Sequence, residues 1–178
     1  MRVFVIRHGQ TNWNLEGKIQ GATNIPLNEN GIKQAEEARE TINGLDIDLI
    51  ICSTLDRAKQ TAQIVNKDKN APIIYDERIM ERNYGEFEGA SSKGMNFREY
   101  LNYYNNKEVK NGETIQEFCK RVFCFLEEIE QKYKDKTILL STHGCVSRAI
   151  ECYYNGIPED GDTTKFMLNN CEVKEYKK

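Results

Sequence analysis

The stretch VFVIRHGQTNWN, residues 3–14, decides the fold, because an apolar run ends abruptly at an arginine, an imidazole and a glycine. Its four apolar residues, 3–6, are typical of a strand that is buried on both faces of a parallel sheet. The imidazole is His8, directly beyond the strand. A second stretch, ILLSTHG at 138–144, repeats the pattern and carries His143, the other histidine of the chain.

The rest of the chain alternates strand patterns with helix patterns. Strands are predicted at 48–52 and, shorter, at 72–77, a buried strand is predicted at 137–142, and the alternating tail CEVKEY at 171–176 is typical of an edge strand. Strands that alternate with helices form a mostly parallel sheet with both faces covered, so the sequence predicts an α/β protein, a three-layer αβα sandwich. In such sheets the ligand crevice lies beyond the carboxyl ends of the strands.

Local signals place the helices between these strands. Thr114 and Glu117 form a capping box, which starts a long helix with one apolar stripe. Asn28 is the predicted N-cap of another helix, and two more are predicted, one after the strand at 48–52 and one from 144 to about 154. The residues expected to face the core are Ile32, Ala35, Ala38 and Ile42 after Asn28, then Ala58, Ala62 and Val65, and finally Ile115, Phe118, Val122, Leu126, Ile129 and Tyr133.

Length and composition describe an ordinary globular chain. Its 178 residues are predicted to form one domain, 1–178, since domains typically run to roughly 100–200 residues. The net charge of −3 argues against a general nucleic-acid-binding protein. No apolar run approaches the ~20 residues of a membrane span, and the apolar start is too short for a signal peptide. We therefore expect a cytoplasmic protein that is not bound to a membrane.

The six cysteines show neither a CxxC pair nor zinc-ribbon spacing. In a chain without an export signal they are expected to be reduced thiols, most of them small core residues. Spacing also excludes a cysteine phosphatase. The phosphate-binding loop of cysteine phosphatases has the pattern C-x5-R, with five residues between the cysteine and the arginine. Only four residues separate Cys52 from Arg57, and position 58, where the arginine is needed, is Ala58.

Two histidines and two arginines follow strands whose ends should meet at one edge of the sheet. A lone histidine is more often structural than catalytic, but here Arg7 and His8 follow one strand, Arg57 another and His143 a third. The planar guanidinium group binds phosphate or carboxylate through two parallel hydrogen bonds. Cations that converge without matching acids need an anion, and phosphate is the best candidate. A zinc site would need three or four ligands without adjacent arginines, so no metal is predicted.

Four segments resemble motifs of the histidine phosphatase superfamily, the phosphoglycerate mutase-like family. RHGQTNWN at 7–14 resembles its R-H-G-[EQ]-T-x-x-N signature, and STLDRAKQTA at 53–62 its S-x-L-x-R-A-x-x-T-A segment. ERNYGEFEG at 81–89 is similar to E-R-x-Y-G-x-x-E-G, and STHG at 141–144 to the second histidine motif. The four occur in the family's order, so the resemblance implies the phosphoglycerate mutase-like fold with a short helical cap at about 84–112.

The resemblance also implies roles for individual residues. His8 resembles the nucleophile, whose neutral imidazole attacks phosphorus and forms a phosphohistidine. Arg7, Arg57 and His143 would bind the equatorial oxygens of the phosphoryl group. Glu81, which by its acidic and basic neighbours alone would be assigned to the solvated surface, would protonate the departing oxygen and then activate water. The substrate-binding positions implied by the motifs are Asn14, Gln20, Gly21, Tyr84 and Gly144.

This chain departs from the family pattern beside the second histidine. Many members have another glycine after T-H-G, whereas this chain has Cys145. A side chain there would either crowd the pocket or tuck into the start of the helix, and we favour the second interpretation. Arg148, further along the same helix, is interpreted as a surface residue rather than as part of the phosphate rim.

The same residues serve two reactions. Family members that act as mutases resemble one another in a long basic insertion after the E-R-x-Y-G segment, but only residues 90–112, rich in tyrosine, follow it here. A short cap favours a phosphomonoesterase without metal or cofactor over phosphoglycerate mutase-type transfer. A protein that binds a phosphorylated ligand without turnover would have lost the nucleophile or the acid, and this chain keeps both. The expected partner is a small phosphorylated metabolite; the particular ester and the oligomeric state stay open.

Overall fold

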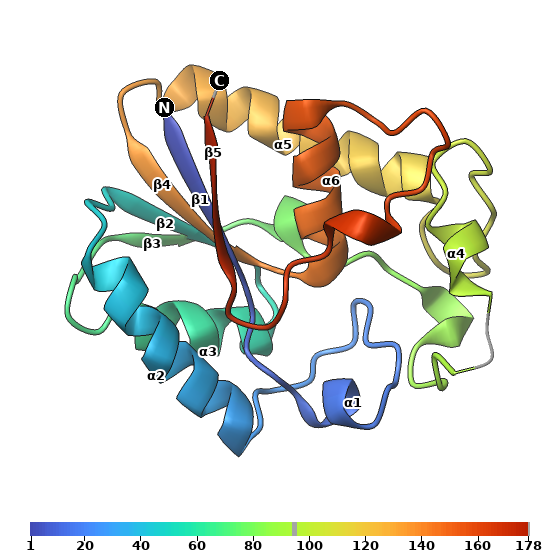
Figure 1. Cartoon of the computed structure of the whole chain (residues 1–178), viewed down its shortest axis with the longest axis horizontal. Helices are drawn as coiled ribbons and strands as arrows, with labels where there is room; N and C mark the ends of the chain where they lie inside the picture. The colour runs from blue at the N-terminus through green and yellow to red at the C-terminus, as the bar shows by residue number, and fades with distance from the viewer. Residues whose placement is uncertain (94–95, 178) are drawn as a thin grey trace.

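A five-stranded sheet forms the centre of the computed structural model, which describes residues 1–93 and 96–177 (Figure 1). Its order is β3-β2-β4-β1-β5. The first four strands run parallel, and β5 pairs antiparallel with β1 at the edge, as expected of a mostly parallel sheet with a terminal edge strand. The strands are β1 (Arg2–Arg7), β2 (Leu49–Cys52), β3 (Ile73–Tyr75), β4 (Thr137–Thr142) and β5 (Val173–Lys177).

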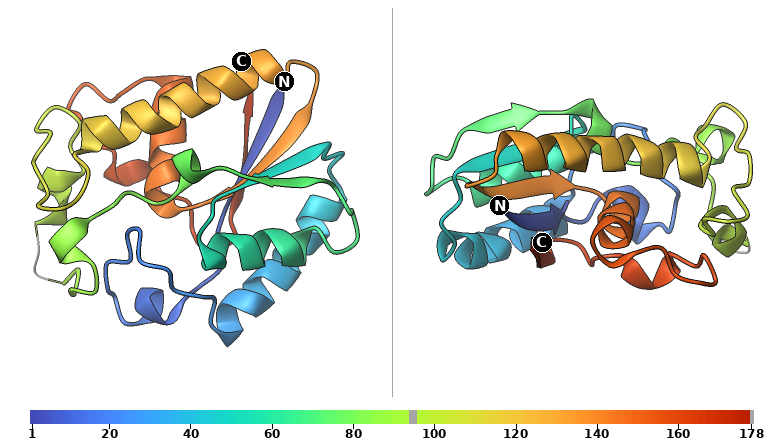
Figure 2. Two further views of the ribbon diagram at one scale, coloured as in Figure 1. Left: turned by 180° about the vertical axis from the view of Figure 1, so that it is seen from behind. Right: turned by 90° about the horizontal axis from the view of Figure 1, so that it is seen from above.

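Two pairs of helices cover the two faces of the sheet (Figure 2). Successive strand residues point to opposite faces, so Val3 packs with α5 and α6, while Phe4 packs with α2 and α3. The predicted three-layer αβα sandwich is confirmed. The helices are α1 (Asn12–Leu15), α2 (Glu29–Asn43), α3 (Asp56–Val65), α4 (Phe97–Tyr100), α5 (Ile115–Lys132) and α6 (Gly144–Asn155), with 3-10 turns η1 (Glu77–Ile79), η2 (Gly85–Phe87) and η3 (Thr164–Phe166). Over the described residues, no helix combines the length and apolarity needed to cross a bilayer.

Side-chain caps start the helices where the sequence predicts. The hydroxyl of Thr114 accepts a hydrogen bond from the backbone N–H of Glu117 at 3.2 Å, and the Glu117 carboxylate accepts one from the N–H of Thr114 at 2.9 Å. Asn28 caps α2 through the N–H of Gly31 at 2.8 Å. The prediction for Ile32 is wrong, because this side chain is 39% exposed. Gly31, its neighbour, takes the inward position on α2, where it contacts the loop after β1.

The six cysteines are free thiols, as expected, and most of them are core residues. Four are buried, Cys171 is partly buried, and Cys124 on α5 is exposed. Burial raises the pKa of the Cys52 and Cys119 thiols to about 12. These two groups therefore act as small apolar side chains of the core rather than as nucleophiles.

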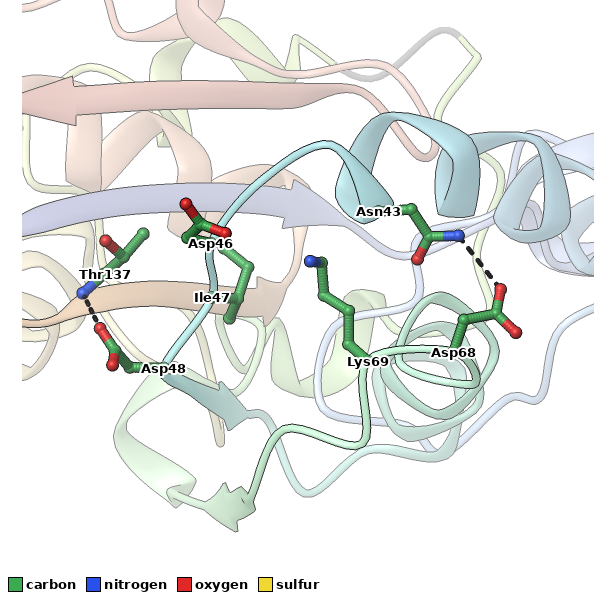
Figure 3. Close-up of a pocket in the computed structure, with 7 residues that line it drawn as sticks. All are labelled: Asn43, Asp46, Ile47, Asp48, Asp68, Lys69 and Thr137. Atoms are coloured by element: carbon green, nitrogen blue, oxygen red, sulfur yellow. Dashed lines mark hydrogen bonds between the residues drawn. The ribbon is translucent and has the colours of Figure 1, made fainter.

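The amino-terminal end of the sheet carries a polar hollow of about 490 Å³ (Figure 3). Asp48 accepts a hydrogen bond from the backbone N–H of Thr137 at 2.8 Å, and Asn43 donates to Asp68 at 3.1 Å. The acids in this hollow outnumber its lysine, Lys69, which makes it a poor site for an anion. The two histidines lie at the other end of the sheet, where β1 and β4 finish.

The close contact between α2 and the loop after β1 predicts that Gly31 tolerates no side chain. A Cβ at Gly31 would lie 2.1 Å from the carbonyl oxygen of Gln10, which is backbone and cannot swing aside. Gly31→Ala should therefore lower the free energy of unfolding by about 1–3 kcal/mol in urea titrations. The control is Gly44→Ala at the other end of α2, where a Cβ would meet its nearest atom at 3.5 Å. Equal stabilities of the two variants would contradict this reading.

Candidate active site

The ends of β1 and β4 bring the two histidines together. Arg7 and Thr142 are partners in the parallel ladder and are the last residues of their strands, so His8 and His143 leave the sheet side by side. Their ring centroids lie 5.3 Å apart, and the backbone N–H of His8 donates to the carbonyl of Thr142 at 2.9 Å. The two histidine motifs therefore meet at the carboxyl ends of the strands, as the sequence predicts.

One hydrogen bond fixes the tautomer of His8. Its Nδ1 lies 2.7 Å from the carbonyl oxygen of Gly9, and a carbonyl only accepts, so Nδ1 carries the hydrogen and Nε2 keeps the lone pair. Burial lowers the pKa of His8 well below 6.5, and the positive charges of Arg57 and Arg7 lower this pKa further. At neutral pH His8 is thus an uncharged imidazole with an unprotonated Nε2, the form that acts as a nucleophile.

His143 and Arg57 form a fully buried pair. Nε of Arg57 donates to Nδ1 of His143 at 3.2 Å, which leaves Nε2 of His143 as the donor to the hydroxyl of Ser53 at 2.7 Å. Burial lowers the pKa of His143 well below 6.5, and the charge of Arg57 adds to the shift. The terminal nitrogens of Arg57 donate to the carbonyls of Thr23 and Gly21 at 2.8 and 2.7 Å, so each keeps one further N–H.

Arg7 and Arg57 lack an ion-pair partner within the part of the chain that the structure describes. Arg7 donates through Nη1 to the carbonyl of Leu168 at 2.7 Å, and its buried Nε has no acceptor. Desolvation lowers the pKa of both guanidinium groups, that of Arg57 to about 10. Glu81 is the strongest opposing charge on both groups, but within the described residues it forms no ion pair with either. An anion bound there would supply the missing acceptors.

Glu81 lies at the amino-terminal end of α6, a position that favours a carboxylate. Its two oxygens accept from the backbone N–H of Cys145 at 3.2 and 3.1 Å, and Oε1 also accepts from the N–H of Arg82 at 3.0 Å. Glu81 therefore joins the cluster that the sequence predicts. It borders a hollow of about 440 Å³, which is lined by Ala22, Glu77, Arg78, Met80, Glu81, Asn83, Glu113 and Arg121.

Protein partners occupy the side chains of several predicted substrate-binding positions. Asn14 accepts through Oδ1 from the N–H of Thr11 at 3.1 Å as part of the cap of α1, which leaves its amide N–H groups as donors. Gln20 accepts through Oε1 from the hydroxyl of Thr11 at 2.9 Å. A Cβ on Gly144 would lie 3.0 Å from Sδ of Met167 and 3.5 Å from Cζ of Arg7, so the glycine lets both side chains pack closely against the start of α6.

Tyr84 and Cys145 contact each other instead of lining an open pocket. Both are buried, and the Tyr84 hydroxyl lies 3.0 Å from Sγ of Cys145. Cys145 is therefore the buried residue at the helix start that we favoured. The surface interpretation of Arg148 is wrong: this residue is only 9% exposed, and its terminal nitrogens contact the sulfur atoms of Cys145 and Met167 at 3.8 and 3.4 Å. The reason is that α6 is buried on all sides through its first nine residues.

Two carboxylates that the sequence analysis did not single out shape the site. Glu88 accepts from the N–H groups of Ala22 and Thr23 at 2.8 and 2.9 Å and so holds the loop that binds Arg57. Its place in the segment 81–89 was an available signal. Glu113 pairs with Arg121 at 2.8 Å, and no local pattern marks either residue. In the described chain, no group of three His, Cys, Asp or Glu side chains is arranged to hold a metal ion.

The chain belongs to the histidine phosphatase superfamily, branch 1, whose family model matches residues 3–177. It is 35% identical to the uncharacterized phosphatase PhoE of Bacillus subtilis strain 168, over 98% of this chain and 90% of that protein. It is 29% identical to the adenosylcobalamin/alpha-ribazole phosphatase of Escherichia coli K12, over 90% of this chain and 82% of that protein. The solved structure of Bacillus stearothermophilus YhfR superposes with a TM-score of 0.88 at 26% identity, covering 98% of this chain and 89% of that one. The predicted family and fold are confirmed.

Two buried neutral histidines predict that stability falls in acid. In the unfolded chain each takes up a proton near pH 6.5, whereas His8 and His143 in the folded protein stay neutral to lower pH. Lowering the pH from 7.5 to 5.5 should therefore lower the free energy of unfolding by about 1.4 kcal/mol per histidine. Urea titrations at both pH values should show His143→Gln losing about 1.4 kcal/mol less than the wild type. Identical losses would mean that His143 titrates as an ordinary histidine.

Proposed function

We propose that the protein is a phosphomonoesterase that hydrolyses small phosphate esters through a phosphohistidine on His8. The observation that carries this proposal is a pair of ion-pair-free arginines beside a neutral imidazole. Arg7 and Arg57 offer N–H donors and positive charge to one anion, while Nε2 of His8 offers a lone pair. A phosphoryl group uses both features, because its oxygens accept the donors and its phosphorus accepts the lone pair.

In the first step Nε2 of His8 attacks phosphorus, and the bond from phosphorus to the ester oxygen breaks on the opposite side. Negative charge spreads over the equatorial oxygens in the transition state. The buried Nε–H of Arg7 and the remaining N–H groups of Arg57 would donate to these oxygens. His143 would add its Nε2–H, which donates to Ser53 in the absence of substrate. The donors of Arg7 and Arg57 are already in place and would lower the barrier without rearranging, whereas His143 would first give up its hydrogen bond to Ser53.

Glu81 would provide the proton that the departing alkoxide needs. The protonated carboxyl gives its hydrogen to the ester oxygen, and the alcohol leaves. The resulting carboxylate then takes a proton from water as that water attacks the phosphohistidine, which releases inorganic phosphate and restores His8. The adjacent hollow of about 440 Å³ gives the leaving group a place beside this carboxyl group.

We further propose that residues 1–178 form one domain in which residues 84–112 act as a short cap. The described part of this segment contains η2 and α4, whose aromatic rings pack together: the ring centroids of Phe87 and Tyr100 lie 5.2 Å apart. A compact cap leaves the phosphohistidine open to water, which favours hydrolysis over transfer. The names of the two relatives, both phosphatases, support the same class, with a small phosphorylated metabolite as the substrate.

The phosphohistidine predicts a specific chemical behaviour. His8→Ala should abolish turnover of phosphate esters, and the wild-type protein mixed with labelled substrate should carry label that is lost in acid and kept in alkali, as expected of a phosphoramidate. Because arginines supply the positive charge, EDTA should leave activity unchanged. Inactivation by EDTA with rescue by Zn²⁺ or Mg²⁺ would replace this mechanism with metal-assisted hydrolysis.

The acid role of Glu81 predicts a dependence on the leaving group. General acid catalysis contributes roughly 10²–10⁴-fold, but p-nitrophenolate departs without a proton whereas an alkoxide does not. Glu81→Gln should therefore lose most of this factor in the burst phase with glycerol 3-phosphate and much less with p-nitrophenyl phosphate. Equal burst-phase losses on the two esters would show that Glu81 orients the phosphate. No loss on either ester would show that Glu81 takes no part in this step.

A further inference from the structure

Arg121 on α5 directs its entire guanidinium group at the segment that carries Glu81. Nε and Nη2 donate to the two carboxylate oxygens of Glu113, each at 2.8 Å. Nη1 donates to the carbonyls of Arg78 and Met80 at 2.8 and 3.1 Å, and Nη2 also donates to the carbonyl of Glu81 at 3.5 Å. One side chain of a long helix thus holds three backbone carbonyls at, or just before, the proposed acid.

These five hydrogen bonds use all five N–H groups of the guanidinium group. Although Arg121 lines the hollow beside Glu81, it has no donor left for a substrate. The bidentate pair with Glu113 also neutralises its charge. Arg121 is therefore built to hold protein backbone, in contrast to Arg7, whose buried Nε has no acceptor.

Glu113 holds the two residues that follow Glu81 in the chain, one by its side chain and the other by its backbone. Its carboxylate accepts from the N–H of Asn83 at 2.9 Å, and its own N–H donates to the carbonyl of Asn83 at 2.9 Å. Its carbonyl accepts from Nε and Nη2 of Arg82 at 3.0 and 2.8 Å. The backbone on both sides of Glu81 is thus tied to the Arg121–Glu113 pair.

The carboxyl group of Glu81 depends on this anchoring, because its own side-chain contacts are backbone N–H groups of Cys145 and Arg82. Glu81 lies between η1 and η2, outside any strand or long helix. We propose that Arg121 is a positioning residue, which with Glu113 sets the place from which Glu81 delivers its proton to the leaving group. This inference rests on the proposed function of Glu81.

Two substitutions separate anchoring from folding. Arg121→Met keeps an unbranched stem to pack near Phe118, whose ring centroid lies 5.0 Å from Cζ of Arg121, and removes all five donors. Arg121→Lys keeps the charge next to Glu113 but offers at most three N–H groups from one atom, so it restores only part of the grip. The matched control is Arg2→Met at the opposite end of the sheet, because Arg2 also pairs with a glutamate, Glu175, at 2.8 Å and lies 5.2 Å from the ring centroid of Phe4.

The test compares burst-phase phosphorylation of His8 by glycerol 3-phosphate and by p-nitrophenyl phosphate, stopped in alkali, at equal protein concentration. A displaced catalytic group costs about 10²-fold, so Arg121→Met should slow the glycerol 3-phosphate burst by about 10–100-fold. The p-nitrophenyl phosphate burst should fall by less than about 3-fold, because its leaving group needs no proton. Arg121→Lys should fall between Arg121→Met and the wild type, and Arg2→Met should match the wild type on both substrates.

Glu81→Gln is measured in parallel, so that the positioning role of Arg121 can be tested separately from the acid role of Glu81 on which it rests. If Glu81→Gln is selective for the alkyl ester while Arg121→Met slows both esters equally, or neither, the positioning role is overturned and the acid role stands. If Glu81→Gln itself slows both esters equally, the acid assignment fails and the positioning role falls with it. Thermal unfolding of each variant shows whether a loss of activity comes from unfolding. If Arg121→Met is unfolded, Arg121→Lys replaces it: a slower burst with glycerol 3-phosphate alone supports the positioning role, and equal bursts or equal losses on both esters overturn it.

Discussion

The hydrogen bond from Arg57 to Nδ1 of His143 is the contact on which the site depends. It leaves His143 with Nε2 as its donor, and it joins the first turn of α3 to the residue after β4. The charge that makes this bond also helps to keep both histidines neutral, since it lowers the pKa of His8 and of His143. A neutral lysine or glutamine in place of Arg57 would satisfy the imidazole but would not supply this field.

Burying this cation without a counter-ion is unfavourable, and the rest of the fold has to hold it in place. Its terminal nitrogens reach two backbone carbonyls of the loop 20–24, and Glu88 in turn holds the N–H groups of that loop. The two apolar layers of the sandwich stabilise the frame from which these groups project. The free protein is therefore organised for a bound anion, and binding that anion removes the electrostatic cost of the arginines.

Features with local signals could be predicted from the sequence. The strands, the capping box at Thr114 and the residues at the strand ends follow from short patterns, and the structure confirms that His8, Arg57 and His143 meet. Features set by packing between elements could not. Ile32 faces outward because its neighbour fits the loop after β1, and Arg148 is buried because α6 is covered on all sides. Arg121 donates to the backbone carbonyl of Arg78, which lies 43 positions earlier in the chain, and no residue pattern encodes that contact.

In the mechanism that we propose, the groups that bind the phosphoryl group and the group that donates the proton project from different parts of the fold. Arg7 is the last residue of β1 and His8 follows it directly, so the sheet positions both residues. Glu81 lies in a loop, where the Arg121–Glu113 pair holds its backbone and the start of α6 holds its carboxylate. The hollow that we propose for the leaving group borders that loop and not the strands. We therefore expect that substitutions around Glu81 and in the segment 84–112 can change which alcohol is accepted. The groups proposed to bind the phosphoryl group need not change, because a scaffold that separates the two sites lets one vary alone.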